Sequence, residues 1–341
     1  MPERTRRLIK SIKIHRFRSF GDEMIEADLL NIYSGKNNVG KSNILKALNL
    51  FFNGKTDYDS PYLHSRDYNK AFRGASGGKR EVTIEITFLP TGNGALRKEF
   101  GVTKKYYDDR SVPIVEYKST DPEIEAEIRR GNGHVTRQFT AYLNKIEYLY
   151  VPAVRDKNLI RKILLNFEQI IKSEASGDDF SNSMSGLSSI LTEASSGISD
   201  DFEKYIGIPA KATLSTSVAD VLGATKIDVM SGLQVKAKRS RSGPGEIKDV
   251  PVDLFSSGDG VVMAYLVYFL SYLTRKNRKN FIWGYEEPEN SLEYSKVQML
   301  AEEFYEKFTK DAQIFVTTHS PAFIDLRKRT GVLFYRYSSG R

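Results

Sequence analysis

The chain has 341 residues, with 51 Lys and Arg against 43 Asp and Glu, four His and no Cys. This length suits one large α/β domain with insertions or two modules, each with its own core. The lack of cysteine excludes disulfides, thiolate zinc sites and cysteine nucleophiles, and no apolar run is long enough for a membrane span, so we expect a cytoplasmic protein without a membrane partner. The N-terminal stretch also lacks the apolar region of a secretory signal.

The first half of the chain predicts a strand–turn–helix unit followed by a β region. In chain order, the predicted elements are a strand at 8–14, a strand at 29–33, a helix at 43–52, a polar loop at 53–80 and a strand at 81–89. Residues 98–118 show further strand and turn patterns, so we expect an antiparallel β region over 81–150.

The second half again alternates strands and helices near its end. In chain order, the predicted elements are a helix at 156–172, a Ser-rich loop at 177–197, strands at 212–217 and 225–238, a Gly/Ser/Pro loop at 240–245, helices at 261–273 and 296–309, and strands at 281–285, 313–317 and 331–335. Strand–helix alternation at both chain ends implies a parallel sheet with the middle of the chain inserted between its halves. We therefore expect an N-terminal lobe at 1–155, a helical insertion at 156–210 and a C-terminal lobe at 211–341.

The segment from Gly35 to Ser42 matches the phosphate-binding pattern G-x-x-x-x-G-K-[ST] at every position. It follows a predicted strand and opens a predicted helix, which is the setting that this motif requires. Backbone N–H groups of the loop can hold a phosphate, Lys41 reaches the β- and γ-phosphates, and the Ser42 hydroxyl ligates Mg²⁺. The residues expected to bind ATP are Gly35, Lys36, Asn37, Asn38, Val39, Gly40, Lys41, Ser42 and Asn43.

Two further apolar strands lead into residues whose side chains can bind a metal, accept a proton or contact a phosphate. The strand at 281–285 leads into Glu286, which we place on the metal side, and Glu287, which we expect to act as general base. The strand at 313–317 leads towards His319, at the sheet edge where open α/β sheets bind ligands. This position favours contact between His319 and the γ-phosphate.

The order of these motifs resembles that of the ATP-binding-cassette ATPases: Walker A, signature, Walker B and switch His. Within them the chain is most similar to the soluble RecF/SMC-like branch, and above all to the ATPase region of the overcoming-lysogenization-defect (OLD) family and its antiphage relatives. The segments that carry the resemblance lie within about 8–52 and 253–325 and are IKSIKIHRFRSF, NIYSGKNNVGKSNIL, FSSGD, YEEPENSLE and VTTHSP. The chain departs from the pattern at Glu286, where many relatives have Asp, and in a signature without a second consecutive Gly; a Gln-loop is not evident.

The resemblance implies an α/β P-loop NTPase head with a mixed sheet, an antiparallel β subdomain and an inserted helical subdomain. It implies an ATPase whose protomers pair head to tail around two Mg-ATP, as a homodimer or a higher homo-oligomer. The catalytic residues would be Lys41, Glu287 and His319. The signature residues acting on the partner's nucleotide would be Ser256, Ser257 and Gly258, and the D-loop residues would be Asn290, Ser291 and Leu292.

Three biological roles stay open at this point. The first is an ATP-gated regulator in bacterial antiphage defence, whose dimer controls a nuclease or other effector in cis or in trans. The second is a RecF-like repair ATPase that clamps duplex DNA, and the third is an oligomeric scaffold with slow hydrolysis. OLD proteins usually append a TOPRIM nuclease domain, whose Glu and Asp-x-Asp signature we do not find in this sequence. We therefore expect no nuclease activity from this chain and leave open that it is part of a longer protein.

Basic residues provide a candidate surface for DNA. The net charge of +8 is uneven, because stretches at 1–18, 236–241, 275–279 and 327–329 carry +6, +4, +4 and +3 and leave the rest acidic. Such stretches are common on solvated helix ends and loops, and they also suit a phosphate backbone. The residues expected to contact DNA, just ahead of the signature, are Lys236, Lys238, Arg239 and Arg241.

Overall fold

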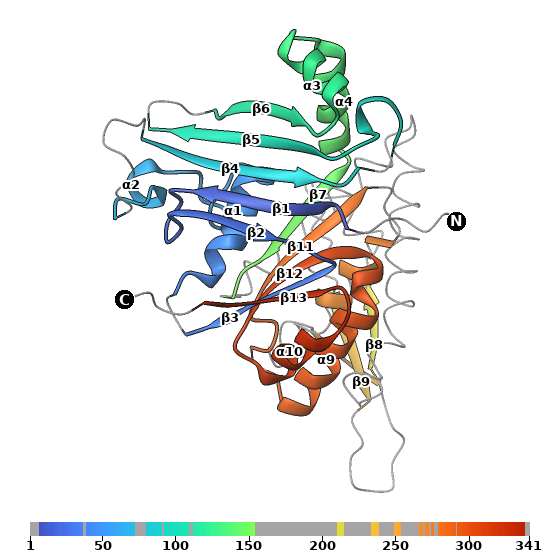
Figure 1. Ribbon diagram of the computed structural model, residues 1–341. Coiled ribbons are helices and arrows are strands. Elements are labelled where there is room, and N and C mark those ends of the chain that lie inside the picture. The colour runs from blue at the N-terminus through green and yellow to red at the C-terminus, as the bar shows by residue number, and fades with distance from the viewer. Residues whose placement is uncertain are drawn as a thin grey trace, which may run out of the picture. The chain divides into compact units, whose positions relative to one another are not determined.

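A computed structural model describes two compact units of the chain (Figure 1). The described residues are 7–36, 39–71, 80–90, 92–108, 112–153, 210–214, 233–238, 249–253, 266–268, 270–272, 274–275, 279–290 and 292–337. One unit consists of residues 1–153, 278–289 and 300–341, and the other of residues 154–277 and 290–299. The finer division into a helical insertion at 156–210 and a lobe from 211 stays a prediction.

A five-stranded parallel sheet in the first unit has the strand order β13-β3-β12-β11-β7. Its strands are β3 (Leu30–Gly35), β7 (Ile146–Val151), β11 (Asn280–Glu286), β12 (Ala312–Thr318) and β13 (Val332–Tyr337). Every residue of β12 is buried, as expected for a strand covered on both faces. The parallel sheet predicted from the two chain ends is confirmed, and its order places the carboxyl ends of β3, β12 and β11 side by side.

The same unit contains an antiparallel sheet of order β2-β1-β4-β5-β6. Its strands are β1 (Ile9–His15), β2 (Asp22–Glu26), β4 (Glu81–Phe88), β5 (Phe100–Tyr107) and β6 (Ile114–Ser119). The strict alternation in β4 puts Val82, Ile84, Ile86 and Phe88 on the buried face. Short elements α2 (His64–Asp67) and η1 (Gly94–Leu96) lie in the connections.

The expectation of an antiparallel region reaching residue 150 is wrong beyond β6. Two helices follow, α3 (Pro122–Arg129) and α4 (Gly133–Leu143), and the next strand, β7, joins the parallel sheet. Residues that favour a helix start precede both helices. Asp121, which is followed by a proline, caps α3, and its carboxylate accepts from the N–H groups of Glu123 and Ile124. Asn132 caps α4, and its side chain accepts from His134 N–H.

Helix α1 (Lys41–Asn53) shares one buried core with both sheets (Figure 1). Apolar residues at helical spacing, including Ile44, Leu45 and Leu48, form its buried face. Side chains from β5 bond carbonyls at its carboxyl end: the Tyr106 hydroxyl donates to Leu50 O at 3.0 Å, and Lys104 Nζ donates to Phe51 O at 2.5 Å. Burial lowers the pKa of Lys104. These contacts hold the far end of the helix that begins at the phosphate-binding loop.

Elements after β11 add aromatic contacts to the parallel sheet. Trp283 and Tyr285 on β11 contact Phe308 and Phe304, each pair with ring centroids 5.7 Å apart. Phe304 in turn lies 5.4 Å from Phe323. Phe304 lies in α9 (Tyr294–Glu306), Phe308 in η4 (Phe308–Lys310) and Phe323 in α10 (Pro321–Asp325), which is followed by η5 (Leu326–Lys328).

A buried glutamine connects β12 to the beginnings of β1 and β3. The Gln313 side chain is fully buried, and its carbonyl oxygen accepts from the N–H groups of Leu8 and Ile9 at 3.0 and 2.7 Å. Its amide nitrogen donates to Ile9 O and Asp28 O at 2.8 and 2.9 Å. Both ends of the amide are therefore hydrogen-bonded, as a buried polar group requires.

The second unit contains a three-stranded antiparallel sheet of order β10-β9-β8. Its strands are β8 (Ala210–Leu214), β9 (Leu233–Lys238) and β10 (Asp249–Asp253). Within the apolar helix predicted at 261–273, residues 266–268 and 270–272 are helical. The predicted helix at 156–172 and the loops at 177–197 and 240–245 lie outside the described residues.

Candidate nucleotide site

The phosphate-binding loop joins β3 to α1. Gly40 adopts a left-handed conformation with φ of 94°, and a Cβ there would collide with the Ser19 hydroxyl. Asn43 N–H donates to Gly40 O at 2.9 Å, and Asn43 Nδ2 donates to Ser19 Oγ at 2.8 Å. Only glycine fits position 40 without strain, because both the backbone angle and the space exclude a side chain. Asn37 and Asn38 lie outside the described residues.

An ion-pair network holds the loop around Ser19 beside α1. The Arg18 guanidinium bonds Asp57 at 2.8 Å and the fully buried Asp67 at 2.9 Å, while Lys46 of α1 lies 3.0 Å from Asp57. Burial opposes ionisation of Asp57, but hydrogen bonds and charges from Arg18 and Lys46 outweigh it and lower its pKa to about 2. The network ties the β1–β2 loop to the helix that carries Lys41.

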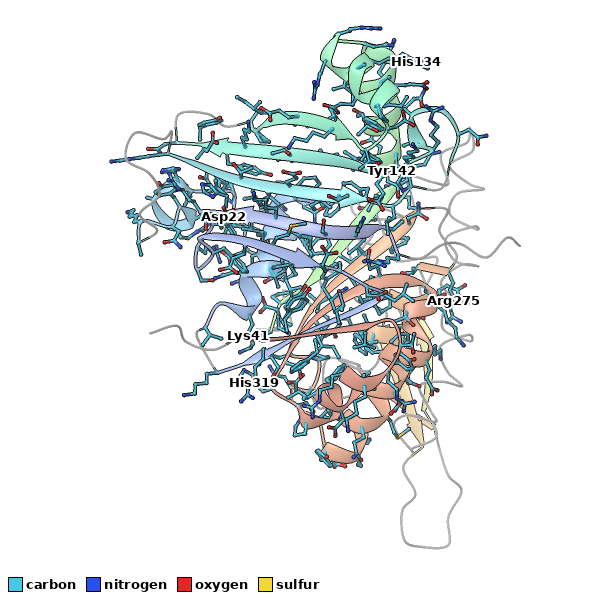
Figure 2. The ribbon with its side chains drawn as sticks, viewed as in Figure 1. Asp22, Lys41, His134, Tyr142, Arg275 and His319 are labelled. Atoms are coloured by element: carbon cyan, nitrogen blue, oxygen red, sulfur yellow. The ribbon has the colours of Figure 1, made fainter. Side chains whose placement is uncertain are left out.

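Lys41, the first residue of α1, points towards the end of β12. Its Nζ donates to Gly35 O at 3.1 Å and Lys36 O at 2.9 Å and lies 2.9 Å from His319 Nε2. Only 6% of Lys41 is exposed, and burial lowers its pKa, although the charges of Glu287 and Glu289 act in the opposite direction. Figure 2 shows Lys41 and His319 together at this edge of the sheet.

Glu287 lies directly after β11 in a backbone conformation that non-glycine residues seldom adopt, with φ of 45°. Its N–H donates to Thr317 O of β12 at 2.8 Å, and its Oε1 lies 3.5 Å from His319 Nε2. About 30% of its side chain is exposed, so solvent reaches the carboxylate. Strained residues of this kind cluster at functional sites.

His319 Nε2 lies near Lys41 and Glu287, and the two contacts require different protonation of this nitrogen. Lys41 carries only donors, so a bond from its ammonium needs an unprotonated Nε2. A bond or ion pair with Glu287 needs a proton on that nitrogen. The contacts with Lys41 and with Glu287 are therefore alternatives, because Nε2 is either unprotonated and accepts a hydrogen bond or protonated and donates one. His319 can therefore act as acceptor or donor within reach of both residues.

Glu286, the last residue of β11, is only 6% exposed and bonds to β7 and the residues after it. The Tyr150 hydroxyl donates to its Oε1 at 2.7 Å, and Ala153 N–H donates to its Oε2 at 3.2 Å. Burial and the neighbouring carboxylate raise the pKa of Tyr150 well above its ordinary value, so this hydroxyl stays a donor. The sequence pattern does not reveal this role of Tyr150, because it predicts an antiparallel region over 81–150.

Glu289 is a second residue that sequence reasoning missed. Its Oε1 accepts from the Thr318 hydroxyl and the His319 N–H, each at 2.7 Å, and from the Ser320 N–H at 3.1 Å. The signal available in the sequence was a third carboxylate two residues beyond Glu287. A single carboxylate oxygen thus joins the residues after β11 to those after β12.

This arrangement fits the phosphates of a nucleotide. The amino end of a 13-residue helix without an acidic residue in its first turn, a buried ammonium and a histidine meet at one sheet edge. The Ser42 hydroxyl and the Glu286 carboxylate are oxygen donors of the kind that Mg²⁺ prefers. In the described part of the chain, no group of three or more Asp, Glu or His lies close enough together to hold a metal.

Comparison with known proteins assigns the family. A family model described as an AAA ATPase domain matches residues 8–211 and 153–324. The chain belongs to this family. An ATP/GTP phosphatase of Helicobacter pylori is 24% identical to this chain, in an alignment that covers 94% of this chain and 87% of the relative. The protein is thus an ATPase that binds nucleotide.

Solved structures agree with this assignment at the level of the fold. The ATPase superposes on an Smc head bound to the C-winged helix domain of ScpA with a TM-score of 0.56, at 15% identity and over 93% of this chain and 91% of that one. A Pyrococcus furiosus Smc head with an extended coiled coil, bound to the C-terminal domain of ScpA, gives a TM-score of 0.54 with the same identity and coverage. The fold of the ATPase is therefore that of a P-loop head of the SMC type.

The other predicted site residues of the ATPase fall in or near its second unit. Lys236 and Lys238 lie on β9, whereas Arg239, Arg241 and the signature residues Ser256, Ser257 and Gly258 lie outside the described residues. Of the D-loop positions, Asn290 and Leu292 follow β11 and Ser291 is not described. Their roles stay predictions. No helix within the described ranges is both long and apolar enough to cross a membrane.

Proposed function

We propose that the ATPase hydrolyses ATP to ADP and phosphate with Lys41, Glu287 and His319 as its catalytic residues. The observation that carries this proposal is their convergence: His319 Nε2 lies 2.9 Å from Lys41 Nζ and 3.5 Å from Glu287 Oε1, at the adjoining ends of β3, β12 and β11. The similarity to an ATP/GTP phosphatase of Helicobacter pylori supports the reaction and makes GTP the competing substrate to test.

In this reaction Glu287 accepts a proton from water as the water oxygen forms its bond to the γ-phosphorus. The bond between that phosphorus and the bridging oxygen breaks, and ADP leaves with the electron pair. Lys41 and His319 stabilise the negative charge on the γ-phosphate oxygens, because a phosphate between them would accept a hydrogen bond from each residue. Mg²⁺, which we propose is held by Ser42 and Glu286, would neutralise phosphate charge when bound.

We further propose that two protomers pair head to tail around ATP. Ser256, Ser257 and Gly258 of one protomer would face the γ-phosphate bound by the other, and Asn290, Ser291 and Leu292 would lie across the interface. The resemblance to the OLD family supports a dimer that gates a nuclease or another effector in antiphage defence. Co-purification of a neighbouring gene product that depends on ATP would support this role.

Three variants test the chemistry. Lys41→Ala should abolish nucleotide binding, and Glu287→Gln should bind ATP but hydrolyse it at least about 10²-fold more slowly, because the general base is lost. Glu293→Gln, at an exposed position after β11, is the matched control and should retain wild-type hydrolysis. Wild-type turnover by Glu287→Gln would refute the assignment of the base. Particle mass with and without ATP then tests the dimer, which Glu287→Gln should trap.

DNA clamping is a second candidate, favoured by lysines on adjoining strands. The register of the second unit's sheet places Lys236 of β9 opposite Lys211 of β8, with Lys238 two residues further along. Reversing the charge at Arg239 and Arg241 should weaken binding of duplex DNA without changing ATP affinity. Duplex DNA that neither binds nor raises ATP hydrolysis at low salt would exclude this candidate.

A further inference from the structure

We propose that Glu289 is a positioning residue that sets the place of His319 relative to Lys41 and Glu287. The inference rests on the proposed role of His319 in hydrolysis. It assigns a task to the third carboxylate of the segment that follows β11, a residue to which the proposed function gives no part in binding ATP or activating water.

The strand ladder of β12 does not extend to His319. A parallel strand fixes its residues through the ladder only as far as the ladder runs, and β12 pairs with β3 up to Thr318 and with β11 up to Thr317. His319 comes next, and its side chain is 37% exposed. Packing alone therefore does not fix its position.

Glu289 provides the missing restraint. Three consecutive residues donate to its Oε1: Thr318 through its hydroxyl, and His319 and Ser320 through their N–H groups, at 2.7, 2.7 and 3.1 Å. A carboxylate that accepts several bonds at one oxygen is a strong anchor, because each bond is charge-assisted. The backbone of His319 is thus held by the same short segment that contains Glu287.

The other side of the turn is closed by the next helix. Ser320 Oγ accepts from Ala322 N–H at 3.2 Å, and Pro321 occupies the first turn of α10. Thr318 Oγ1 also accepts from Ser320 N–H at 2.9 Å. His319 therefore lies between a strand end bonded to Glu289 and a capped helix, in a position where its ring contacts Lys41.

The two oxygens of Glu289 are not equivalent, and this difference supplies a discriminating variant. All three bonds go to Oε1, whereas Oε2 is buried without a hydrogen-bond partner among the described residues. Glu289→Gln can place its carbonyl oxygen where Oε1 lies and keep the three donors satisfied. Glu289→Ala removes the acceptor altogether.

The experiment is a double-mutant cycle on kcat between Glu289 and His319, with ADP binding measured in parallel. Glu289→Ala should lower kcat about 10²-fold, since a displacement near 1 Å at a reacting group costs that much, and should change ADP affinity less than about threefold. Glu289→Gln should stay within about threefold of wild type. In a His319→Ala background, Glu289→Ala should cause no further loss, because a residue that acts through His319 has nothing left to position.

The proposal would be overturned if the decreases in kcat caused by Glu289→Ala and His319→Ala added up in the double variant. It would also be overturned if Glu289→Gln lowered kcat as much as Glu289→Ala does. If Glu289→Ala does not fold, Thr318→Val serves instead: it removes one donor of the turn and should lower kcat severalfold, again only while His319 is present. Wild-type kcat in His319→Ala alone would count against the proposed function. A loss in His319→Ala with no loss in Glu289→Ala would leave that function standing and refute the positioning role.

Discussion

Replacing Gln313 with Glu tests the buried network that ties β12 to β1 and β3. One carboxylate oxygen can still accept from the N–H groups of Leu8 and Ile9. The other would face Ile9 O and Asp28 O, which now lie 2.8 and 2.9 Å from the donating amide nitrogen. Both carbonyls lose the Gln313 donor, although Asp28 O keeps its bond from Asn31 Nδ2 at 2.7 Å, and an ionised Glu oxygen would face the two carbonyl oxygens without a hydrogen-bond donor. We expect a loss of about 3 to 5 kcal/mol in the free energy of unfolding at pH 7.

The loss should depend on pH with a defined sign. The buried site disfavours ionisation, so the folded-state pKa of the new carboxyl rises above its unfolded value of about 4.3. The folded variant then holds its proton more tightly than the unfolded chain. Relative to wild type, the variant should be most stable below about pH 4.3 and should lose about 1.4 kcal/mol per pH unit above it, until the folded pKa is reached.

Urea unfolding followed by tryptophan fluorescence measures this difference. Trp283 is the only tryptophan in the chain, is 1% exposed and pairs with Ile314, the neighbour of Gln313. Gln313→Met is the control, because it removes the bonds without adding a titratable group, and its loss relative to wild type should not change with pH. If the difference between Gln313→Glu and wild type were also constant from about pH 4 to about pH 7, the reasoning would be refuted.

Two further predictions follow from the hydrogen bonds around the site. Tyr150→Phe removes the hydroxyl that donates to Glu286, so it should raise severalfold the Mg²⁺ concentration needed for half-maximal hydrolysis and leave the binding of metal-free ADP unchanged. Tyr148→Phe, on the same strand, is the control. The Tyr148 hydroxyl bonds Leu45 O at 2.9 Å, so its loss should lower thermal stability without changing the Mg²⁺ dependence. A metal dependence altered equally in both would contradict the assignment. Because the folded pKa of Asp57 is lowered to about 2, its contribution to stability is present above about pH 4 and is lost as pH falls towards 2, so Asp57→Asn should flatten acid unfolding in that range.

Much of the nucleotide site could be predicted because its residues follow contiguous, recognisable segments. The segment from Gly35 to Ser42 carries its own backbone requirement, and Gly40 adopts the left-handed angle that the motif needs. The strands before Glu286 and His319 contain the apolar stretches 281–283 and 314–316, which indicate buried parallel strands and so locate their ends. Each of these inferences needs only local information.

The residues that hold the site in place escaped prediction because their partners are far away in the chain. Tyr150 bonds a carboxylate 136 positions away, and Gln313 bonds Ile9 across 304 positions. Glu289 is closer, but its donors follow a different strand, 29 to 31 positions later. Nothing in the local pattern separates these side chains from ordinary solvated polar residues.

The sequence by itself determined the class of fold, the phosphate-binding loop and the chemical identity of the groups at two strand ends, since all three depend on local backbone preference and hydrophobic pattern. Only the tertiary structure decided that β7 joins the parallel sheet instead of the antiparallel one, and that Tyr150 thereby reaches Glu286. It also decided that Glu289 anchors the His319 turn. The physical reason is that a hydrogen bond between strand ends depends on strand order, and strand order is fixed by the packing of the whole sheet.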